Sequence, residues 1–201
     1  MTLQTKSQEP RLSKRRAILD SAYAIVRLRG VDALTLEAVA REAEVSKGGL
    51  LYHFPNKDAL IGGLIAQAAG DFDASLTAHL GAATDAPGGW LQAFINASFD
   101  DDPGDSNANM GLLAAAAINP SLLDPIRTRY AEWQARTESA GIDPTVATII
   151  RLAVDGLTFA DLFGLAPPPG LARDRLREAL LTMASKETHD HPHSSIVPPD
   201  E

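Results

Sequence analysis

A short segment in the first third of the chain combines residues that could bind a polyanion. Residues 45–61, VSKGGLLYHFPNKDALI, hold two lysines, a tyrosine and a histidine beside two adjacent glycines. Lysine donates hydrogen bonds to phosphates or base edges, and Tyr52 and His53 carry hydrogen-bonding groups on apolar rings. Glycine costs about 1 kcal/mol in a helix relative to alanine, so Gly48 and Gly49 require a reason such as close approach of a ligand. The alternative is a tolerated, frayed first turn.

Helical periodicity predicts several short helices that would position this segment. Apolar residues recur at three- and four-residue steps in residues 13–29, and Gly30 follows as a stop signal. Thr35 can cap a second helix, and Ser46 can cap a third that ends before Pro55. The asparagine after this proline can cap a fourth helix. Short helices joined by tight turns indicate a helix-turn-helix unit.

The third of these helices has the features of a recognition helix. Such a helix lies in a DNA major groove about 12 Å wide, with its N-terminal residues close to the bases. Small side chains at its start permit this approach, and Lys47 supplies a donor there. Lys57 falls in the first turn of the next helix, where backbone amides already favour an anion. A lone His53 is more often structural, but its neighbours favour phosphate contact.

Composition excludes several classes of protein. The 201-residue chain is 45% hydrophobic and has no cysteine, so disulfides and thiolate metal sites are excluded. Because it has neither a secretory signal nor a long apolar run, we expect no membrane segment and a cytoplasmic location. No nucleophile elbow, phosphate loop, dinucleotide glycine pattern or HExxH motif occurs. We therefore expect neither an enzyme nor a cofactor.

Charge is distributed unevenly along the chain. Residues 1–60 hold ten Lys and Arg against seven Asp and Glu, a net charge of +3. Because the whole chain has a net charge of −8, the remaining residues have a net charge of −11. This asymmetry suggests that only the N-terminal part faces a polyanion. Small charge biases between halves are also common, and the asymmetry alone does not decide the question.

The motif around the recognition helix resembles a known family. TLEAVAREAEVSKGGLLYHFPNKDALI, residues 35–61, resembles the DNA-binding segment of the TetR family of bacterial transcriptional repressors, with RRAILDSAYAIVRLRG in place upstream. The resemblance implies an all-α fold of about nine helices, with an N-terminal three-helix helix-turn-helix head and a helical ligand-binding and dimerisation body. It also implies a cytoplasmic homodimer that binds double-stranded DNA at a palindromic operator. A small-molecule effector would release the repressor from that operator.

The resemblance also implies roles for individual residues. Thr35 would contact backbone phosphate, and Lys47 and Gly48 would reach base edges. Leu50 would fill the head core or touch a base. The full set of DNA-binding candidates is Thr35, Ser46, Lys47, Gly48, Leu50, Tyr52, His53 and Lys57, the last three anchoring phosphates.

One residue departs from the family pattern. Glu44 stands in the turn where the family usually has glycine. A non-glycine residue at positive φ costs about 1–2 kcal/mol, so we expect either a rearranged turn or a less stable head.

The rest of the chain divides into segments by composition and periodicity. We predict a disordered basic arm at 1–12, the DNA-binding domain at 13–61, the ligand-binding and dimerisation domain at 62–186 and a disordered tail at 187–201. Within the body, helices are expected at about 89–99, 105–117, 121–139, 143–164 and 171–185. Gly62 and Gly63 stand at its start. They could allow close packing against the first helix, or soften the fourth helix as a hinge.

The helix expected at 143–164 is apolar nearly all round, so it must be buried on more than one side. An intramolecular core helix would meet this condition. The family resemblance favours a four-helix bundle across a dimer axis, built from this helix and the one at 171–185. The dimer-interface candidates are Ile149, Leu157, Leu176, Leu180 and Met183.

An effector pocket should be mainly apolar with a few polar groups. Its candidate residues are Trp90, Phe94, Met110, Leu113, Trp133, Asp155 and Phe159, although large apolar residues at helical spacing are also expected in any core. A buried Asp155 needs a partner, either Arg151 within the helix or a cationic ligand.

Two polar clusters carry weaker signals. Aspartates at 100–105 fit no ordered metal loop, and the histidines of HDHPHSS at 189–195 lie in a proline-rich, acidic tail. We expect no metal site in either. The alternative function is a regulator of the same fold that responds to a metal ion or a protein partner.

Overall fold

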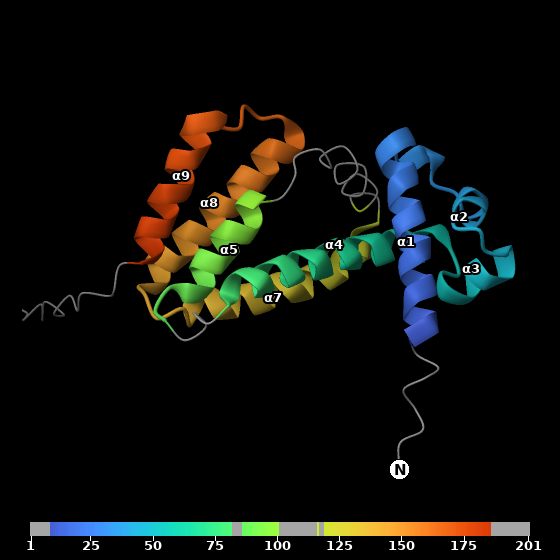
Figure 1. Cartoon of the computed structure of the whole chain (residues 1–201), viewed down its shortest axis with the longest axis horizontal. Helices are drawn as coiled ribbons and strands as arrows, with labels where there is room; N and C mark the ends of the chain where they lie inside the picture. Colours follow the sequence, from blue (N-terminus) through green and yellow to red (C-terminus); the bar gives the residue numbers. More distant parts are fainter. Residues whose placement is uncertain (1–8, 82–85, 101–115, 117–118, 186–201) are drawn as a thin grey trace, which may run out of the picture.

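The chain is helical throughout the part that the computed structural model describes, which comprises residues 9–81, 86–100, 116 and 119–185 (Figure 1). No strand occurs among these residues, and the predicted all-α fold is confirmed. In chain order the elements are α1 (Glu9–Arg29), the 3₁₀ turn η1 (Val31–Ala33), α2 (Leu36–Glu42), α3 (Lys47–His53), α4 (Lys57–Leu80), α5 (Gly89–Asp100), the 3₁₀ turn η3 (Pro120–Leu123), α7 (Asp124–Glu138), α8 (Pro144–Phe163) and α9 (Gly170–Ala184).

Most helix boundaries lie close to their predicted positions. The clearest difference is at α1, which begins at Glu9, inside the predicted basic arm. Residues 1–8, most of the helix expected at 105–117 and the tail at 187–201 lie outside the described residues. Within the described residues, no helix combines the length and the apolar character needed to cross a membrane.

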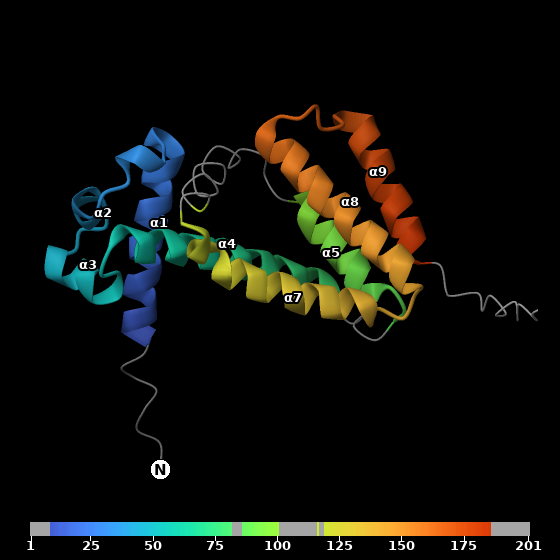
Figure 2. The same ribbon diagram turned by 180° about the vertical axis from the view of Figure 1, so that it is seen from behind.

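The helices form two groups joined by α4. We call α1, α2, α3 and the first turns of α4 the head, and the remainder the body. From the head, α4 continues into the body, where it lies alongside α7 (Figure 1). The opposite view shows α5, α8 and α9 beside the half of this pair that lies away from the head (Figure 2). Within this group, α5 packs against both α8 and α9.

Side-chain caps start three helices of the head and its junction. Thr35 Oγ1 accepts the Ala38 N–H at 3.1 Å, and Ser46 Oγ accepts the Gly49 N–H at 3.1 Å. The side chain of Asn56 does the same at the start of α4, at 2.8 Å from the nitrogen it accepts. These bonds satisfy backbone donors that the helices leave unpaired, so the predicted caps are confirmed.

Glu44 takes the left-handed conformation that its position requires. Its φ is 52°, and the Val45 N–H bonds to Ala40 O at 3.0 Å while the Glu44 N–H bonds to Arg41 O at 3.3 Å. These two bonds form a Schellman motif, which usually has glycine at the left-handed position. The turn therefore keeps the usual geometry, and the head bears a conformational cost of about 1–2 kcal/mol.

Close packing explains one of the two glycines in α4. A Cβ at Gly63 would lie 2.7 Å from Phe54 Cε1 and 3.1 Å from Leu19 Cδ2, both in the head core. The predicted packing of α4 against α1 is thus confirmed at this residue. At Gly62 the nearest atom to a Cβ would be Leu122 Cδ2, at 3.8 Å, so this position faces η3. The hinge remains a prediction.

Two hydrophobic cores lie along the molecule, and α4 contributes to both. Leu60 and Leu64 are buried in the head core, whereas Leu76 is buried in the body core. Leu122, from η3 in the body, is also buried in the head core, and Ile126 of α7 packs against both. The head is therefore completed by residues far along the chain.

Polar contacts add to this connection between head and body. The guanidinium of Arg16 donates to both carboxylate oxygens of Asp71, at 2.9 and 3.1 Å. At the start of α4, Asn119 Nδ2 donates to Asp58 Oδ2 at 2.9 Å. Because these groups are exposed, each pair contributes only about 0–1 kcal/mol to stability.

Candidate nucleic-acid interface and effector site

The recognition helix α3 presents one face to the head core and one to solvent. Leu50 is fully buried and the capping residue Phe54 is 2% exposed, which fixes the inner face. Lys47 and Gly48 lie exposed at the N-terminus, and Tyr52 is 65% exposed one turn further along. The outer face therefore carries a cation, a bare backbone and a phenol, a set suited to base edges and phosphates.

The structure decides between the two roles predicted for Leu50. Its side chain belongs to the head core, so it holds α3 in place and has no exposed surface with which to touch a base. Thr35 and Ser46 are engaged as helix caps through their oxygen atoms. A hydroxyl that accepts a backbone N–H still has its own proton to donate, so phosphate contact stays compatible with capping.

The two glycines of α3 differ in their surroundings. A Cβ at Gly49 would lie 3.2 Å from Ser46 Oγ, so its absence leaves room for the cap. A Cβ at Gly48 would meet nothing within 4 Å. No neighbour within the described residues therefore explains glycine at 48, and close approach of DNA stays the predicted reason.

Predicted phosphate anchors gather where α3 ends and α4 begins. His53 is half-buried, and its ring meets Tyr52 edge-on with the ring centroids 5.1 Å apart. The Lys57 ammonium donates to the Val31 carbonyl at 3.2 Å, which ties the start of α4 to the turn after α1. Lys57 therefore has a structural contact that the sequence did not indicate.

Lys47 has a partner that the sequence did not reveal. Its ammonium lies 2.7 Å from Glu37 Oε1 on α2, and both side chains are more than 60% exposed, at 63% and 67%. The hydrogen bond from Lys47 lowers the pKa of Glu37, with smaller contributions from a backbone hydrogen bond and from the lysine charge. No periodicity links residues ten apart, so only the packing of α2 on α3 identifies this pair.

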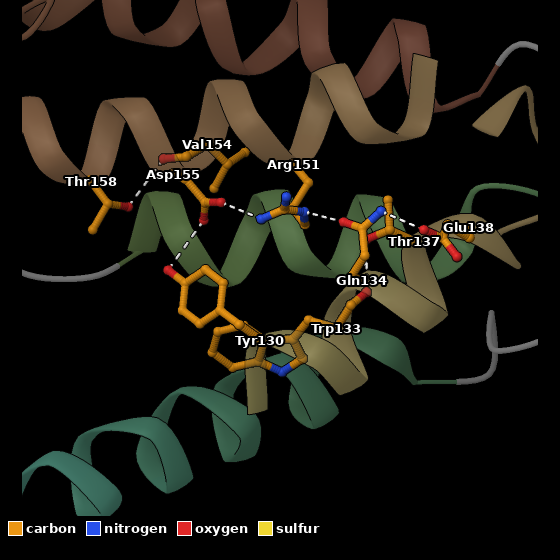
Figure 3. Close-up of polar contacts among 9 residues, drawn as sticks. All are labelled: Tyr130, Trp133, Gln134, Thr137, Glu138, Arg151, Val154, Asp155 and Thr158. Atoms are coloured by element: carbon orange, nitrogen blue, oxygen red, sulfur yellow. Dashed lines mark hydrogen bonds and ion pairs between the residues drawn. The ribbon is translucent and has the colours of Figure 1, made fainter. Parts of the chain in front are cut away.

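In the body, a polar network joins α7 to α8 (Figure 3). Arg151 donates to Asp155 Oδ2 at 2.6 Å and to Gln134 Oε1 at 2.6 Å, and the Tyr130 hydroxyl donates to Asp155 Oδ1 at 3.3 Å. The predicted pair of Arg151 with Asp155 is thus confirmed. Burial raises the pKa of Asp155, although Arg151 and Tyr130 oppose this. Burial and the neighbouring carboxylate raise the pKa of Tyr130 to about 12.

An aromatic cluster lies next to this network. Trp90 stacks on Phe94 with centroids 5.2 Å apart, and Phe72 meets Trp133 at 5.0 Å and Phe94 at 5.5 Å. Tyr130 completes the cluster against Trp133 at 4.9 Å. The Trp133 indole N–H donates to an aspartate of α4, Asp73, at 3.1 Å, so a second carboxylate borders the cluster.

One cavity of the described structure includes a single residue of the predicted pocket set. A cavity of about 480 Å³ lies at the far end of the body, lined by Leu80, Ala86, Pro87, Trp90, Arg136, Ser139, Ala140 and Gly141. Of the predicted set it includes Trp90 alone. Met110 and Leu113 lie outside the described residues. Phe159 is 49% exposed, stacks on Phe163 and does not line this cavity, so its role in a pocket stays a prediction.

The predicted dimer residues separate into buried and exposed groups. Leu157 and Leu180 are 6% and 4% exposed, so both belong to the chain's own core and are not available to a partner. Leu176 and Met183 are partly buried against the body core, whereas Ile149 is 51% exposed. Three further exposed apolar residues follow the same face of α8 at helical spacing. We call the four residues the α8 stripe: Ile149, Leu152, Phe159 and Phe163.

Two family models match the chain. The model described as "Bacterial regulatory proteins, tetR family" matches residues 18–64, and the model described as "Tetracyclin repressor-like, C-terminal domain" matches residues 88–185. The HTH-type transcriptional regulator BetI of Burkholderia thailandensis is 32% identical over 88 residues, which are 44% of this chain and 45% of BetI. The chain thus spans less than half the length of this curated relative.

Solved structures resemble the chain over most of its length. A TetR-family member from Streptomyces coelicolor A3 is 28% identical, with 85% of this chain and 97% of the other covered and a TM-score of 0.65. The multidrug binding protein EbrR in complex with ethidium is 27% identical, with 85% and 98% covered and a TM-score of 0.62. The EbrR complex with malachite green is 28% identical, with 84% and 96% covered and a TM-score of 0.62.

The open environment of Gly48 predicts opposite effects of one substitution. Gly48→Ala should raise the free energy of unfolding by about 0.5–1 kcal/mol, because alanine is the better helix former and meets no neighbour. The same methyl group should weaken DNA binding about tenfold, the scale of one lost base contact. Thermal unfolding and fluorescence anisotropy with labelled DNA measure the two effects. Gly49→Ala is the matched control, because it adds the same methyl group to the neighbouring residue of α3. There the methyl group would crowd the Ser46 cap, whereas at Gly48 it meets no neighbour. Undiminished DNA affinity in Gly48→Ala would contradict the expected close approach of DNA to the backbone at Gly48.

Proposed function

Because the chain belongs to the TetR family of bacterial transcriptional regulators, which are not enzymes, we propose that it represses transcription as a homodimer on a palindromic operator. A small-molecule effector bound in the body releases it from the DNA. Its place of action is then the cytoplasm, where the bacterial chromosome lies. One observation carries the proposal: α3 holds Lys47, bare Gly48 backbone and exposed Tyr52 on the face away from the head core.

The α8 stripe supports the proposal of a homodimer. Its four apolar side chains are 44–55% exposed and lie on one helix, whereas the opposite face of α8 is buried in the chain's own core. Contiguous exposed apolar surface of this kind marks an interaction site. A two-fold symmetric pair would place each stripe against its copy and bury both. Gly156, where a Cβ would meet nothing within 4 Å, lies between Leu152 and Phe159 and allows the helices to approach closely.

Dimerisation gives the two heads a defined separation. Recognition helices that read the two halves of a palindrome lie about 34–36 Å apart, one turn of the duplex. An effector that prefers a different separation lowers operator affinity in proportion to that preference. Because α4 is buried in both cores, it is the element through which a change in the body would move the head.

Aromatic and acidic groups in the body support an organic cation as the effector. Asp155 and Asp73 border the aromatic cluster, where they accept hydrogen bonds from Tyr130 and Trp133. Aromatic faces and carboxylates together attract cations with flat apolar bodies. EbrR, which is 27–28% identical to this chain, has been solved with ethidium and with malachite green. The cation would compete with Arg151 for Asp155. The alternative effectors are a metal ion and a protein partner.

DNA binding is the first property to test. The wild-type protein should bind a palindromic sequence from its own upstream DNA, with affinity that falls steeply as salt rises. In Lys47→Ala/Tyr52→Ala, specific affinity should fall about a hundredfold, because two contacts of about 1–3 kcal/mol each are lost. Inserting about five base pairs between the half-sites should also abolish tight binding. Both substituted side chains are exposed, so thermal unfolding should be unchanged. Weak binding of both proteins to any DNA would contradict operator recognition.

The α8 stripe makes a separate prediction about assembly. Leu152→Glu should convert the dimer to a monomer, because a charge would have to be buried in an apolar interface. Analytical ultracentrifugation at micromolar concentration measures the change. Ala131→Glu adds the same charge to an exposed position on α7 and should leave the dimer intact. A dimer that survives Leu152→Glu would exclude this face as the interface.

The effector proposal predicts opposite results for two partners in one ion pair. Ethidium should bind the wild-type protein and reduce its DNA affinity. Asp155→Asn should weaken ethidium binding about tenfold, because a contact to a charged group is worth about 1.5 kcal/mol or more. Arg151→Gln should strengthen ethidium binding, because it frees the Asp155 carboxylate for the cation. Calorimetry and dye fluorescence give the affinities. Equal binding by the wild type and Asp155→Asn would contradict the proposed site. Loss of effector response on removing residues 187–201 would favour the metal or protein alternative.

A further inference from the structure

Glu37 places a negative charge where DNA is expected to approach. It lies in the first turn of α2, and its carboxylate is within 2.7 Å of the Lys47 ammonium at the first residue of α3. Both side chains are exposed, so the pair forms part of the outer surface beside Gly48. A carboxylate on this surface is repelled by phosphates, and it would weaken DNA binding unless it had a specific contact of its own.

The ion pair with Glu37 changes what Lys47 can contribute to DNA binding. An ammonium has three protons to donate, and the contact with Glu37 uses one of them. The local charge of the pair is near zero, so it adds little to the attraction that any DNA exerts on a cation. A lysine held in this way is better suited to a directed contact than to non-specific attraction. The carboxylate also restricts a long side chain that would otherwise sample many rotamers.

The backbone holds the two residues at a fixed separation. The Thr35 cap sets the start of α2 just before Glu37, and fully buried Val39 anchors the helix in the head core. The Ser46 cap sets the start of α3 just before Lys47. Between them, the left-handed turn at Glu44 fixes the angle between the two helices.

The pair presents hydrogen-bonding groups that match one base pair. In the major groove, guanine offers the acceptors O6 and N7, and its partner cytosine offers the N4 amino donor. Lysine donates to the guanine acceptors, and glutamate accepts from the cytosine amino group. In the same placement, an A·T pair would set the lysine against the adenine N6 amino donor and the glutamate against the thymine O4 acceptor and methyl group. A lysine and a glutamate side by side therefore favour a G·C pair over an A·T pair.

We propose that Glu37 is a specificity-determining residue, which with Lys47 selects a G·C pair in each half of the operator and weakens binding to all other DNA. This inference rests on the proposed operator binding. It assigns to Glu37 two effects that differ in sign: a loss of affinity for random sequence and a gain of discrimination at one position.

Selection from a DNA library randomised within a palindrome tests this inference. The wild-type protein should enrich one G·C position per half-site. Glu37→Gln should lose that preference or shift it towards adenine, since glutamine pairs with adenine N6 and N7. The affinity of Glu37→Gln for random DNA should rise several-fold. The salt dependence of this affinity should also steepen by about one released counterion, because Lys47 becomes free to meet a phosphate.

Glu44→Gln is the matched control. It removes the same charge from the same head, at the turn between α2 and α3, without touching the contact between Glu37 and Lys47. It should keep the wild-type base preference. If Glu37→Gln selects the wild-type motif unchanged, or if Glu44→Gln relaxes it equally, the inference is overturned. If the wild type enriches no motif at all, the proposed operator binding fails, and this inference fails with it.

Discussion

The burial of α4 in two hydrophobic cores is the constraint on which the molecule depends. At one end Leu60 and Leu64 pack in the head, and at the other Leu76 packs in the body. Gly63 brings α4 close to Phe54 and Leu19, so its head end cannot shift without opening a gap in that core. In the proposed mechanism, the orientation of α3 towards DNA would therefore follow the packing of the body helices.

The exposed surface around α3 and the start of α4 carries less unpaired charge than the sequence suggests. The first 60 residues have a net charge of +3, yet Lys47 is paired with Glu37 and Lys57 is bonded to a backbone carbonyl. The glutamate in the turn adds a further acid to the same region. In the proposed operator binding, such a surface would rely more on fit and direction than on charge attraction, a balance that favours specific over random sites.

Local patterns in the sequence predicted the local features of the fold. Caps at Thr35 and Ser46 act on the residues that follow them, and Arg151 meets Asp155 one helical turn away. Positive φ at Glu44 followed from its place in the turn. Contacts between distant residues could not be found in this way, as in the pair between α2 and α3. The direction of α8 was also hidden: because it is apolar on nearly all sides, periodicity could not separate buried Leu157 from exposed Phe159.

The presence of Leu122 in the head core limits how the protein can be divided. The family match to the N-terminal segment ends at residue 64, as if the head were a unit that could be exchanged between relatives. Its core, however, also contains Leu122 and Ala116, with Leu123 and Ile126 packed against it. A head transplanted without these residues would expose part of its interior. In evolution and in protein engineering alike, η3 and the start of α7 would have to travel with the head, or adapt to a new one.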